Sequence, residues 1–257
     1  MYRNTDCKLQ AHRGVCTEAP ENTMAAFRLA VKQGYDIIEF DPKFTKDNVC
    51  VILHDRTLNR TVRVGGNPLG EEPVQIADKL YAEVQGLDVG SWFDPAFAAE
   101  RMPLLSQVLI FAREAGMECK IDNIVQKFTP EQIDIVFDTV EKCGGNVGLT
   151  CSDLSLLRRY AERFPTAPLH YDGVVSGETL DALAEFCAGH ETTVWMRLAD
   201  NPRTAWNKMP PATPELSALV RERFKLGIWI LATDEEMEQA LSLHADIVET
   251  TGGIKPN

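Results

Sequence analysis

Short apolar segments alternate with segments of helical spacing along the whole chain, and this rhythm constrains the fold more than any other feature. We expect strands near residues 7–12, 36–41, 117–121, 146–150, 168–171, 192–198, 227–231 and 245–249. Helices are expected near 24–31, 131–142, 154–164, 179–187 and 235–243, because most of these segments follow a capping residue or end at glycine or proline. A chain of 257 residues with this alternation matches an α/β fold, the (β/α)8 TIM barrel of about 250 residues.

A doubly wound open sheet is the alternative architecture for the same alternation. It usually carries a Gly-x-Gly-x-x-Gly loop after its first strand, and this sequence has none. We therefore predict one barrel domain over residues 1–257, with a small insertion after the second strand. Residues 55–103 are too many for a plain βα loop and include the aromatic pair Trp92 and Phe93, which indicates an insertion or lid subdomain.

Composition excludes several classes of protein. The net charge of −12 argues against a nucleic-acid partner, and it means that local positive groups must attract any anionic substrate. The 7 cysteines are scattered without a Cys-x-x-Cys pair, which indicates reduced thiols and a cytoplasmic location. No apolar run is long enough for a membrane span, so we expect no stable membrane insertion. The sequence does not indicate an oligomeric state.

Charged residues occur in pairs at the expected ends of strands. Glu39 and Asp41 are two residues apart, as are Glu118 and Lys120, so in a strand each pair points to one face. His12 ends the first expected strand, and barrel enzymes carry their catalytic groups at such carboxyl ends. Two neighbouring carboxylates need a cation between them or a raised pKa on one of them. A third carboxylate from another strand would complete a site for a hard divalent cation.

A second histidine is expected at the same rim. The short apolar run at residues 49–53 follows the turn Asp47-Asn48, which predicts that residues 44–53 form a β-hairpin that extends the second strand. His54 follows this hairpin directly, so it can fold back over the barrel mouth. The sequence therefore brings two histidines and three carboxylates to one end of the predicted barrel.

At this point the motifs resemble a known family. They are Ala11-His12-Arg13-Gly14, Pro20-Glu21-Asn22-Thr23, residues 34–41, Thr45-Lys46-Asp47, His54-Asp55, Arg60-Thr61, Gly90-Ser91-Trp92-Phe93, Met102-Pro103-Leu104 and Glu118-Cys119-Lys120. In order and spacing they resemble the glycerophosphodiester phosphodiesterase family over about the first 120 residues. The later residues 228–230 and 245–248 are similar to the last two strands of that family. The chain departs from the family pattern at Pro42, at residues 121–123 and at residues 250–252.

The resemblance implies a function and a role for each matching residue. It implies hydrolysis of a glycerophosphodiester, a small-molecule substrate, to glycerol 3-phosphate and an alcohol, and thus a place in lipid and glycerol metabolism. By the same resemblance the metal ligands for Ca²⁺ or Mg²⁺ are Glu39, Asp41 and Glu118, the acid–base pair is His12 and His54, and the phosphate contacts are Arg13 and Lys120. Such a division suits a phosphodiester, whose transition state concentrates negative charge on its oxygens and whose leaving alkoxide needs a proton.

Alternatives remain open for individual residues and for the whole protein. In place of a phosphate contact, Arg13 would form an ion pair with a neighbouring glutamate, and Lys120 would only neutralise Glu118. Asn22 would cap a helix and would not be a ligand. Trp229 is a candidate for the substrate mouth. Two alternative functions remain open for the whole protein. One is a related barrel phosphodiesterase or phospholipase that acts on a lysophospholipid or another polyol phosphodiester. The other is a barrel that binds a phosphorylated metabolite without turnover.

Overall fold

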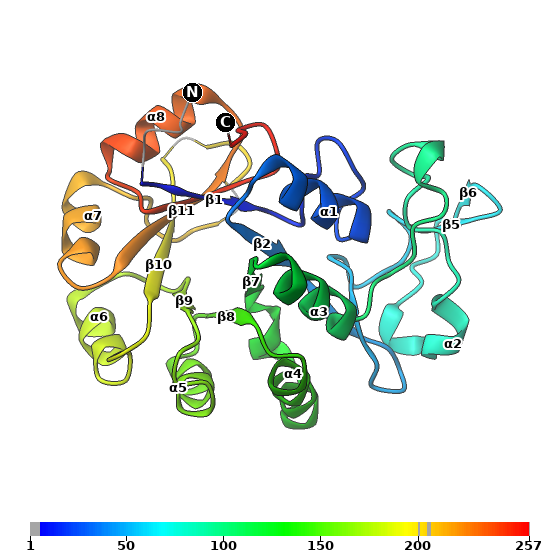
Figure 1. The fold of residues 1–257 in the computed structure, drawn as a ribbon, viewed down its shortest axis with the longest axis horizontal. Coiled ribbons are helices and arrows are strands. Elements are labelled where there is room, and N and C mark those ends of the chain that lie inside the picture. The colour runs from blue at the N-terminus through cyan, green and yellow to red at the C-terminus, as the bar shows by residue number, and fades with distance from the viewer. Residues whose placement is uncertain (1–5, 200, 205–206, 257) are drawn as a thin grey trace.

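A closed barrel of parallel strands forms the centre of the computed structural model, which describes residues 6–199, 201–204 and 207–256 (Figure 1). Its strands are β1 (Lys8–Ala11), β2 (Ile37–Phe40), β7 (Glu118–Ile121), β8 (Asn146–Cys151), β9 (Leu169–Tyr171), β10 (Thr192–Arg197), β11 (Lys225–Leu231) and β12 (Ile247–Thr250). Pairing of β1 with both β2 and β12 closes the ring. The predicted (β/α)8 barrel is therefore confirmed, and each barrel strand lies where the alternation predicted one.

Helices surround the ring of strands (Figure 1). They are α1 (Met24–Gln33), α3 (Leu105–Ala115), α4 (Pro130–Cys143), α5 (Leu154–Arg163), α6 (Gly177–Ala184), α7 (Pro214–Arg221) and α8 (Asp234–Ser242), with the 3-10 helix η3 (Asn123–Lys127) after β7. The sequence did not predict α3 or α7. Leu104 precedes α3 and has no side chain that can cap a helix, so the usual start signal is missing there.

The two faces of the barrel strands carry different residues. Apolar side chains such as Leu9, Phe40 and Ile121 belong to the main hydrophobic core. Their neighbours along the same strands, Gln10 and Lys120 among them, are polar and buried, and strand alternation turns them toward the barrel axis. Barrel interiors are usually filled by branched apolar residues. The buried polar side chains inside this barrel therefore need hydrogen bonds and ion pairs with one another.

Close packing inside the barrel depends on two glycines. A Cβ atom on Gly148 would collide with the imidazole of His170, and one on Gly227 would collide with the indole of Trp195. Trp195 Nε1 donates a hydrogen bond of 3.1 Å to His170 Nδ1, so these two buried rings support each other. Two large rings thus occupy the space that two missing side chains leave free.

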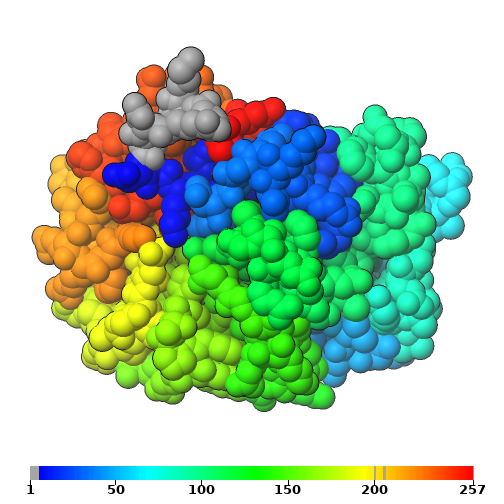
Figure 2. Space-filling view, viewed as in Figure 1, coloured from blue at the N-terminus to red at the C-terminus, as the bar shows by residue number. Residues whose placement is uncertain are grey.

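Residues between β2 and α3 form a lobe beside the barrel. The predicted hairpin is present as the antiparallel strands β3 (Pro42–Phe44) and β4 (Cys50–Ile52). It is followed by β5 (Arg63–Val64), β6 (Asn67–Pro68), the 3-10 helix η1 (Ile76–Asp78), α2 (Tyr81–Val84) and the 3-10 helix η2 (Pro95–Phe97). Figures 1 and 2 show this lobe in cyan and green at one edge of the molecule. A small apolar cluster around Leu58, Val62 and Val84 holds it together.

Two further expectations concern thiols and membranes. All seven cysteines are free. Among the helices of the described residues, none has the length and apolar character needed to cross a membrane.

Replacing Gly148 by alanine tests the packing of the barrel interior. Because His170 is buried and cannot move away, we expect Gly148→Ala to lower the free energy of unfolding by about 1–3 kcal/mol. Gly177→Ala is the matched control, since nothing lies within 4 Å of its added Cβ. Chemical denaturation measures both values, and equal stability of the two variants would contradict this account of the interior.

Candidate functional site

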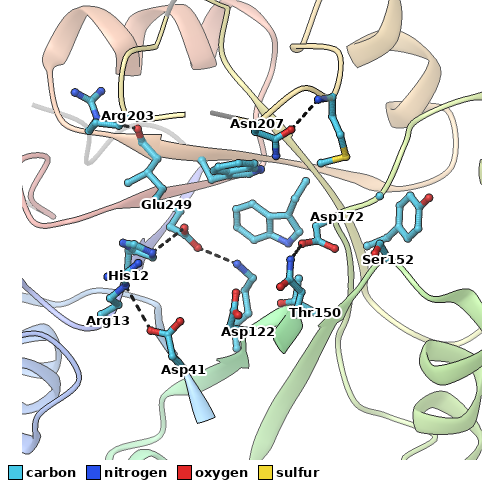
Figure 3. Close-up of a pocket in the computed structure, with 18 of the residues that line it drawn as sticks. His12, Arg13, Asp41, Asp122, Thr150, Ser152, Asp172, Arg203, Asn207 and Glu249 are labelled. Atoms are coloured by element: carbon cyan, nitrogen blue, oxygen red, sulfur yellow. Dashed lines mark hydrogen bonds and ion pairs between the residues drawn. The ribbon is translucent and has the colours of Figure 1, made fainter. Parts of the chain in front are cut away.

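A cavity of about 760 Å³ opens at the carboxyl ends of the barrel strands. His12, Asp41 and Asp122 line it just beyond the ends of β1, β2 and β7, and Asp172 follows β9 (Figure 3). His54, which follows the hairpin, also lines the cavity, as the sequence predicted. Parallel strands therefore deliver side chains that are far apart in the sequence to one place, as in other barrels of this class.

The turn after β1 packs closely against α1 and makes a hydrogen bond to β2. Arg13 and Gly14 both have positive φ angles, 58° and 80°, and a Cβ atom on Gly14 would lie 2.6 Å from Ala26 Cβ. Glycine is therefore required at residue 14. The same turn points the backbone N–H of Arg13 at Glu39, with a distance of 2.9 Å from N to Oε2.

Three carboxylates form the group best suited to hold a cation. One oxygen from each of Glu39, Asp41 and Asp122 lies within 4.8 Å of the other two. Asp41 follows β2, and Asp122 follows the neighbouring strand β7, where Phe40 and Ile121 are paired. The sequence predicted Glu39 and Asp41 as members of this group, but it did not assign Asp122.

Hydrogen bonds from the protein orient these carboxylates. Asn22 Nδ2 donates to Asp41 Oδ2 at 2.7 Å, and the backbone N–H of Ile124 donates to Asp122 Oδ1 at 3.0 Å. Asn22 was expected to be a helix cap, but Thr23 caps α1 instead. Asn22 has a φ of 56°, and this left-handed conformation turns its amide toward Asp41.

Burial and mutual repulsion raise the pKa values of two of these carboxylates. Desolvation and the charge of Asp41 raise the pKa of Glu39 well above its usual value. The same two causes, desolvation first, raise the pKa of Asp122 to about 6. Carboxylates held this close favour either a shared proton or a bound cation. Their oxygen donors fit a hard divalent ion such as Ca²⁺ or Mg²⁺.

Glu118 does not lie with Glu39 and Asp41. The sequence placed it at the carboxyl end of its strand, and this prediction is wrong, because it lies at the amino end. It is the first residue of β7, and Lys8 Nζ at the start of β1 donates to its Oε2 at 3.3 Å. Asn146 at the start of β8 also donates to it. Four residues of strand separate Glu118 from Asp122, or about 13 Å. The alternation was predicted correctly, but the carboxylate that reaches the cavity is two residues beyond Lys120.

The two histidines have different surroundings. Burial and the nearby charge of Arg13 lower the pKa of His12 to about 3, so its ring is neutral. His54 is more exposed, and its Nδ1 lies 2.7 Å from Asp55 Oδ1. Although burial opposes it, hydrogen bonds from Arg60 and His54 lower the pKa of Asp55 to about 2. Asp55 is therefore a stable anion that fixes the orientation of His54.

The predicted substrate contacts all line the cavity, but each also has a protein partner. Arg13 Nε lies 3.4 Å from Asp41 Oδ2, and its Nη1 lies 3.1 Å from Glu21. Lys120 pairs with Glu249 at 2.8 Å and does not neutralise Glu118, whose lysine partner is Lys8. Trp229 lines the cavity as predicted.

The opposite wall of the cavity contains residues that the sequence did not indicate. Asn123 donates a hydrogen bond to Asp172, and Thr150 and Tyr171 also line the cavity. These residues come from β8, β9 and the start of η3, where no motif stands out in the sequence. Position at the carboxyl end of a barrel strand is the one signal that would have selected them.

Comparison with known proteins is consistent with this geometry. The model of the glycerophosphoryl diester phosphodiesterase family matches residues 12–193. The chain is 46% identical to YhdW of Bacillus subtilis (strain 168) over 165 residues, which are 62% of this chain and 62% of that protein. It is 41% identical to the glycerophosphodiester phosphodiesterase of Caldanaerobacter subterraneus subsp. tengcongensis over 98 residues, 38% of this chain and 37% of that protein. The matched regions thus span less than two thirds of either relative.

The fold is also similar to solved structures. One is an Oleispira antarctica phosphodiesterase in complex with the product sn-glycerol-3-phosphate, with a TM-score of 0.74 and 18% identity. The match covers 96% of this chain and 93% of that one. This similarity supports the barrel fold.

The raised pKa of Asp122 predicts a pH effect on the metal-free protein. Its pKa is about 6 in the folded state, against a usual 3.8, so its stabilising contribution is present at acid pH and is lost as pH rises through 6. With a chelator present, we expect wild type to gain about 1 kcal/mol between pH 7 and pH 5 relative to Asp122→Asn. Chemical denaturation at both pH values measures this, and parallel pH profiles would contradict the assignment.

Proposed function

Because the chain belongs to the glycerophosphoryl diester phosphodiesterase family, we propose that it hydrolyses a glycerophosphodiester to glycerol 3-phosphate and an alcohol. One observation carries the proposal: Asp41 and Asp122 line the cavity together with His12 and His54, and an oxygen of Glu39 lies within 4.8 Å of both carboxylates. A carboxylate group can hold a cation that neutralises a phosphodiester, and two imidazoles can handle the two protons of hydrolysis.

The proposed cofactor is one divalent cation, Ca²⁺ or Mg²⁺, held by Glu39, Asp41 and Asp122. The raised pKa values of Glu39 and Asp122 support this choice, because a bound cation would relieve the repulsion among these groups. When bound, such an ion supplies positive charge for the phosphoryl oxygens and for the charge that develops on them during hydrolysis. Glu118, at the other end of β7, is replaced by Asp122 in this proposal.

The histidines are proposed to divide the proton transfers. His12 is neutral and lines the cavity, so it is able to accept a proton from the attacking oxygen. Asp55 holds Nδ1 of His54, which leaves Nε2 directed away from that contact. The oriented ring of His54 lines the cavity, so His54 is proposed as the donor to the leaving alkoxide.

Binding of the substrate phosphate is assigned to Arg13 and Lys120. Both side chains line the cavity together with Asp41 and Asp122, and they supply local positive charge in a protein of net charge −12. A cationic side chain is needed there, because the overall field repels an anionic diester.

The alcohol is proposed to occupy the opposite wall. Trp195, Trp229 and Met209 give the cavity an apolar surface, and Asn123 and Asp172 give it further polar groups. A cavity of about 760 Å³ exceeds the needs of a small diester, which keeps a lysophospholipid or another polyol phosphodiester as the second candidate substrate. The cytoplasmic location and the role in lipid and glycerol metabolism remain predictions.

The lid role of residues 55–103 also remains a prediction. Within the described part of the chain, the residues that line the cavity lie outside this segment. Its direct link to the site is Asp55, which bonds to His54, and Arg60 in turn bonds to both Asp55 and Glu21.

Turnover of a diester tests the proposal directly. We expect the protein with Ca²⁺ or Mg²⁺ to release glycerol 3-phosphate from glycerophosphodiesters, and a chelator to stop the reaction. Each acid–base group contributes about 10²–10⁴-fold, so His12→Ala/His54→Ala should lower kcat by at least about 10⁴-fold. His190→Ala, away from the cavity, is the control and should retain activity. Product analysis over a panel of diesters identifies the alcohol, and activity in the doubly substituted protein would reject the mechanism.

Cation binding tests the ligand set independently of turnover. Asp122→Asn keeps the side-chain shape but removes a charge, so we expect it to weaken Ca²⁺ binding by about tenfold or more. Glu118→Gln is the matched control, because it removes a buried charge at the other end of the same strand and should leave Ca²⁺ affinity nearly unchanged. Isothermal titration calorimetry measures both, and the reverse order would restore Glu118 as the ligand.

A further inference from the structure

A glutamate that no motif indicates lies at the centre of the barrel. Glu249 is on β12 and is 4% exposed. Its Oε2 accepts a hydrogen bond of 2.8 Å from Lys120 Nζ and a second bond from Gln10, and its Oε1 lies 3.9 Å from His12 Nε2 (Figure 3). A charge buried this deeply is costly unless it is paired and hydrogen-bonded. Its partners therefore account for how the fold tolerates it.

Lys120 has a second set of acidic neighbours. Its strand pairs with β2 so that Lys120 is opposite Glu39, and it lies two residues before Asp122 on the same face. The charges of both Glu39 and Asp122 act on the Lys120 ammonium. This ammonium is therefore a cationic group that can compete with a metal ion for the three carboxylates, as can Arg13, whose Nε lies 3.4 Å from Asp41 Oδ2.

The observed conformation keeps the ammonium away from that competition. Lys120 Nζ bonds to Glu249 and lies 4.1 Å from the centre of the Trp195 ring. Both contacts are on residues of the other barrel strands, β12 and β10. Either contact would be lost if the lysine side chain turned to pair with the group of Glu39, Asp41 and Asp122.

We propose that Glu249 is a positioning residue: by binding the ammonium of Lys120, it leaves Glu39, Asp41 and Asp122 available to a divalent cation. This inference rests on the proposed cation site. Without the Glu249 carboxylate, Lys120 pairs with the acidic group and neutralises part of it. Glu249 thus controls cation affinity from outside the set of ligands.

A double-mutant cycle separates this role from a general charge effect. Removing the Glu249 charge weakens cation binding slightly by long-range electrostatics, whether or not Lys120 is present. If Glu249 acts through Lys120, its substitution matters far more when the lysine is there. The variants are Glu249→Gln, Lys120→Met and the double substitution, measured in the full chain by calorimetry with CaCl₂.

We expect Glu249→Gln to weaken Ca²⁺ binding at least tenfold in the presence of Lys120 and less than threefold in the Lys120→Met background. Glu118→Gln, which also removes a buried glutamate paired with a lysine, is the control and should change the affinity less than twofold. An equal loss in both backgrounds would overturn the proposal and leave the cation site intact. Failure of the wild-type protein to bind Ca²⁺ or Mg²⁺ would overturn the cation site and this inference together.

Stability of the variants is checked by circular dichroism and thermal melting. If Glu249→Gln does not fold, Glu249→Asp and the double substitution complete the comparison, because the first keeps the charge and the second removes both members of the pair. We expect Glu249→Asp to bind Ca²⁺ within about threefold of wild type, because it keeps an acid that can hold Lys120, and the double variant to bind within about threefold of Lys120→Met, because no lysine is left to compete. A double variant that binds Ca²⁺ tenfold or more weakly than Lys120→Met would overturn the proposal.

Discussion

Repulsion among three carboxylates at the barrel mouth is the constraint on which the rest of the site depends. Glu39, Asp41 and Asp122 approach within 4.8 Å of one another, and their pKa values cannot all remain in the usual range. At an effective dielectric constant of about 20, two unit charges about 5 Å apart repel by about 3 kcal/mol. The fold maintains this arrangement because the barrel strands and the turn after β1 hold each carboxylate in place.

Charged side chains also occur inside the barrel, from the amino ends of the strands to the cavity. Lys8 and Glu118 pair at the amino ends of the strands, and Lys120 and Glu249 pair nearer the cavity. Buried pairs of this kind add little net stability, since desolvation offsets much of their attraction. Their value is geometric, because each fixes a charged side chain at a definite height in the barrel. The apolar faces of the same strands supply the stability by packing against the helices.

Sequence patterns predicted the barrel well, because apolar alternation and helix boundaries are local properties that each segment carries by itself. They predicted the approach of His12, His54, Glu39 and Asp41 for a similar reason, since carboxyl ends of parallel strands meet at one rim. They misplaced Glu118 because alternation does not say where along a strand the rim lies. Glu249 and Asp172 were missed, since their importance arises from contacts with distant residues.

The most direct test of the account is a crystal structure of the protein soaked with Mn²⁺, whose anomalous scattering locates the ion. Mn²⁺ accepts the same oxygen donors as Ca²⁺ and Mg²⁺. We predict one strong anomalous peak within bonding distance of Glu39, Asp41 and Asp122, with Lys120 still paired to Glu249. A peak beside Glu118, or no peak among the three carboxylates at saturating Mn²⁺, would contradict the central claim.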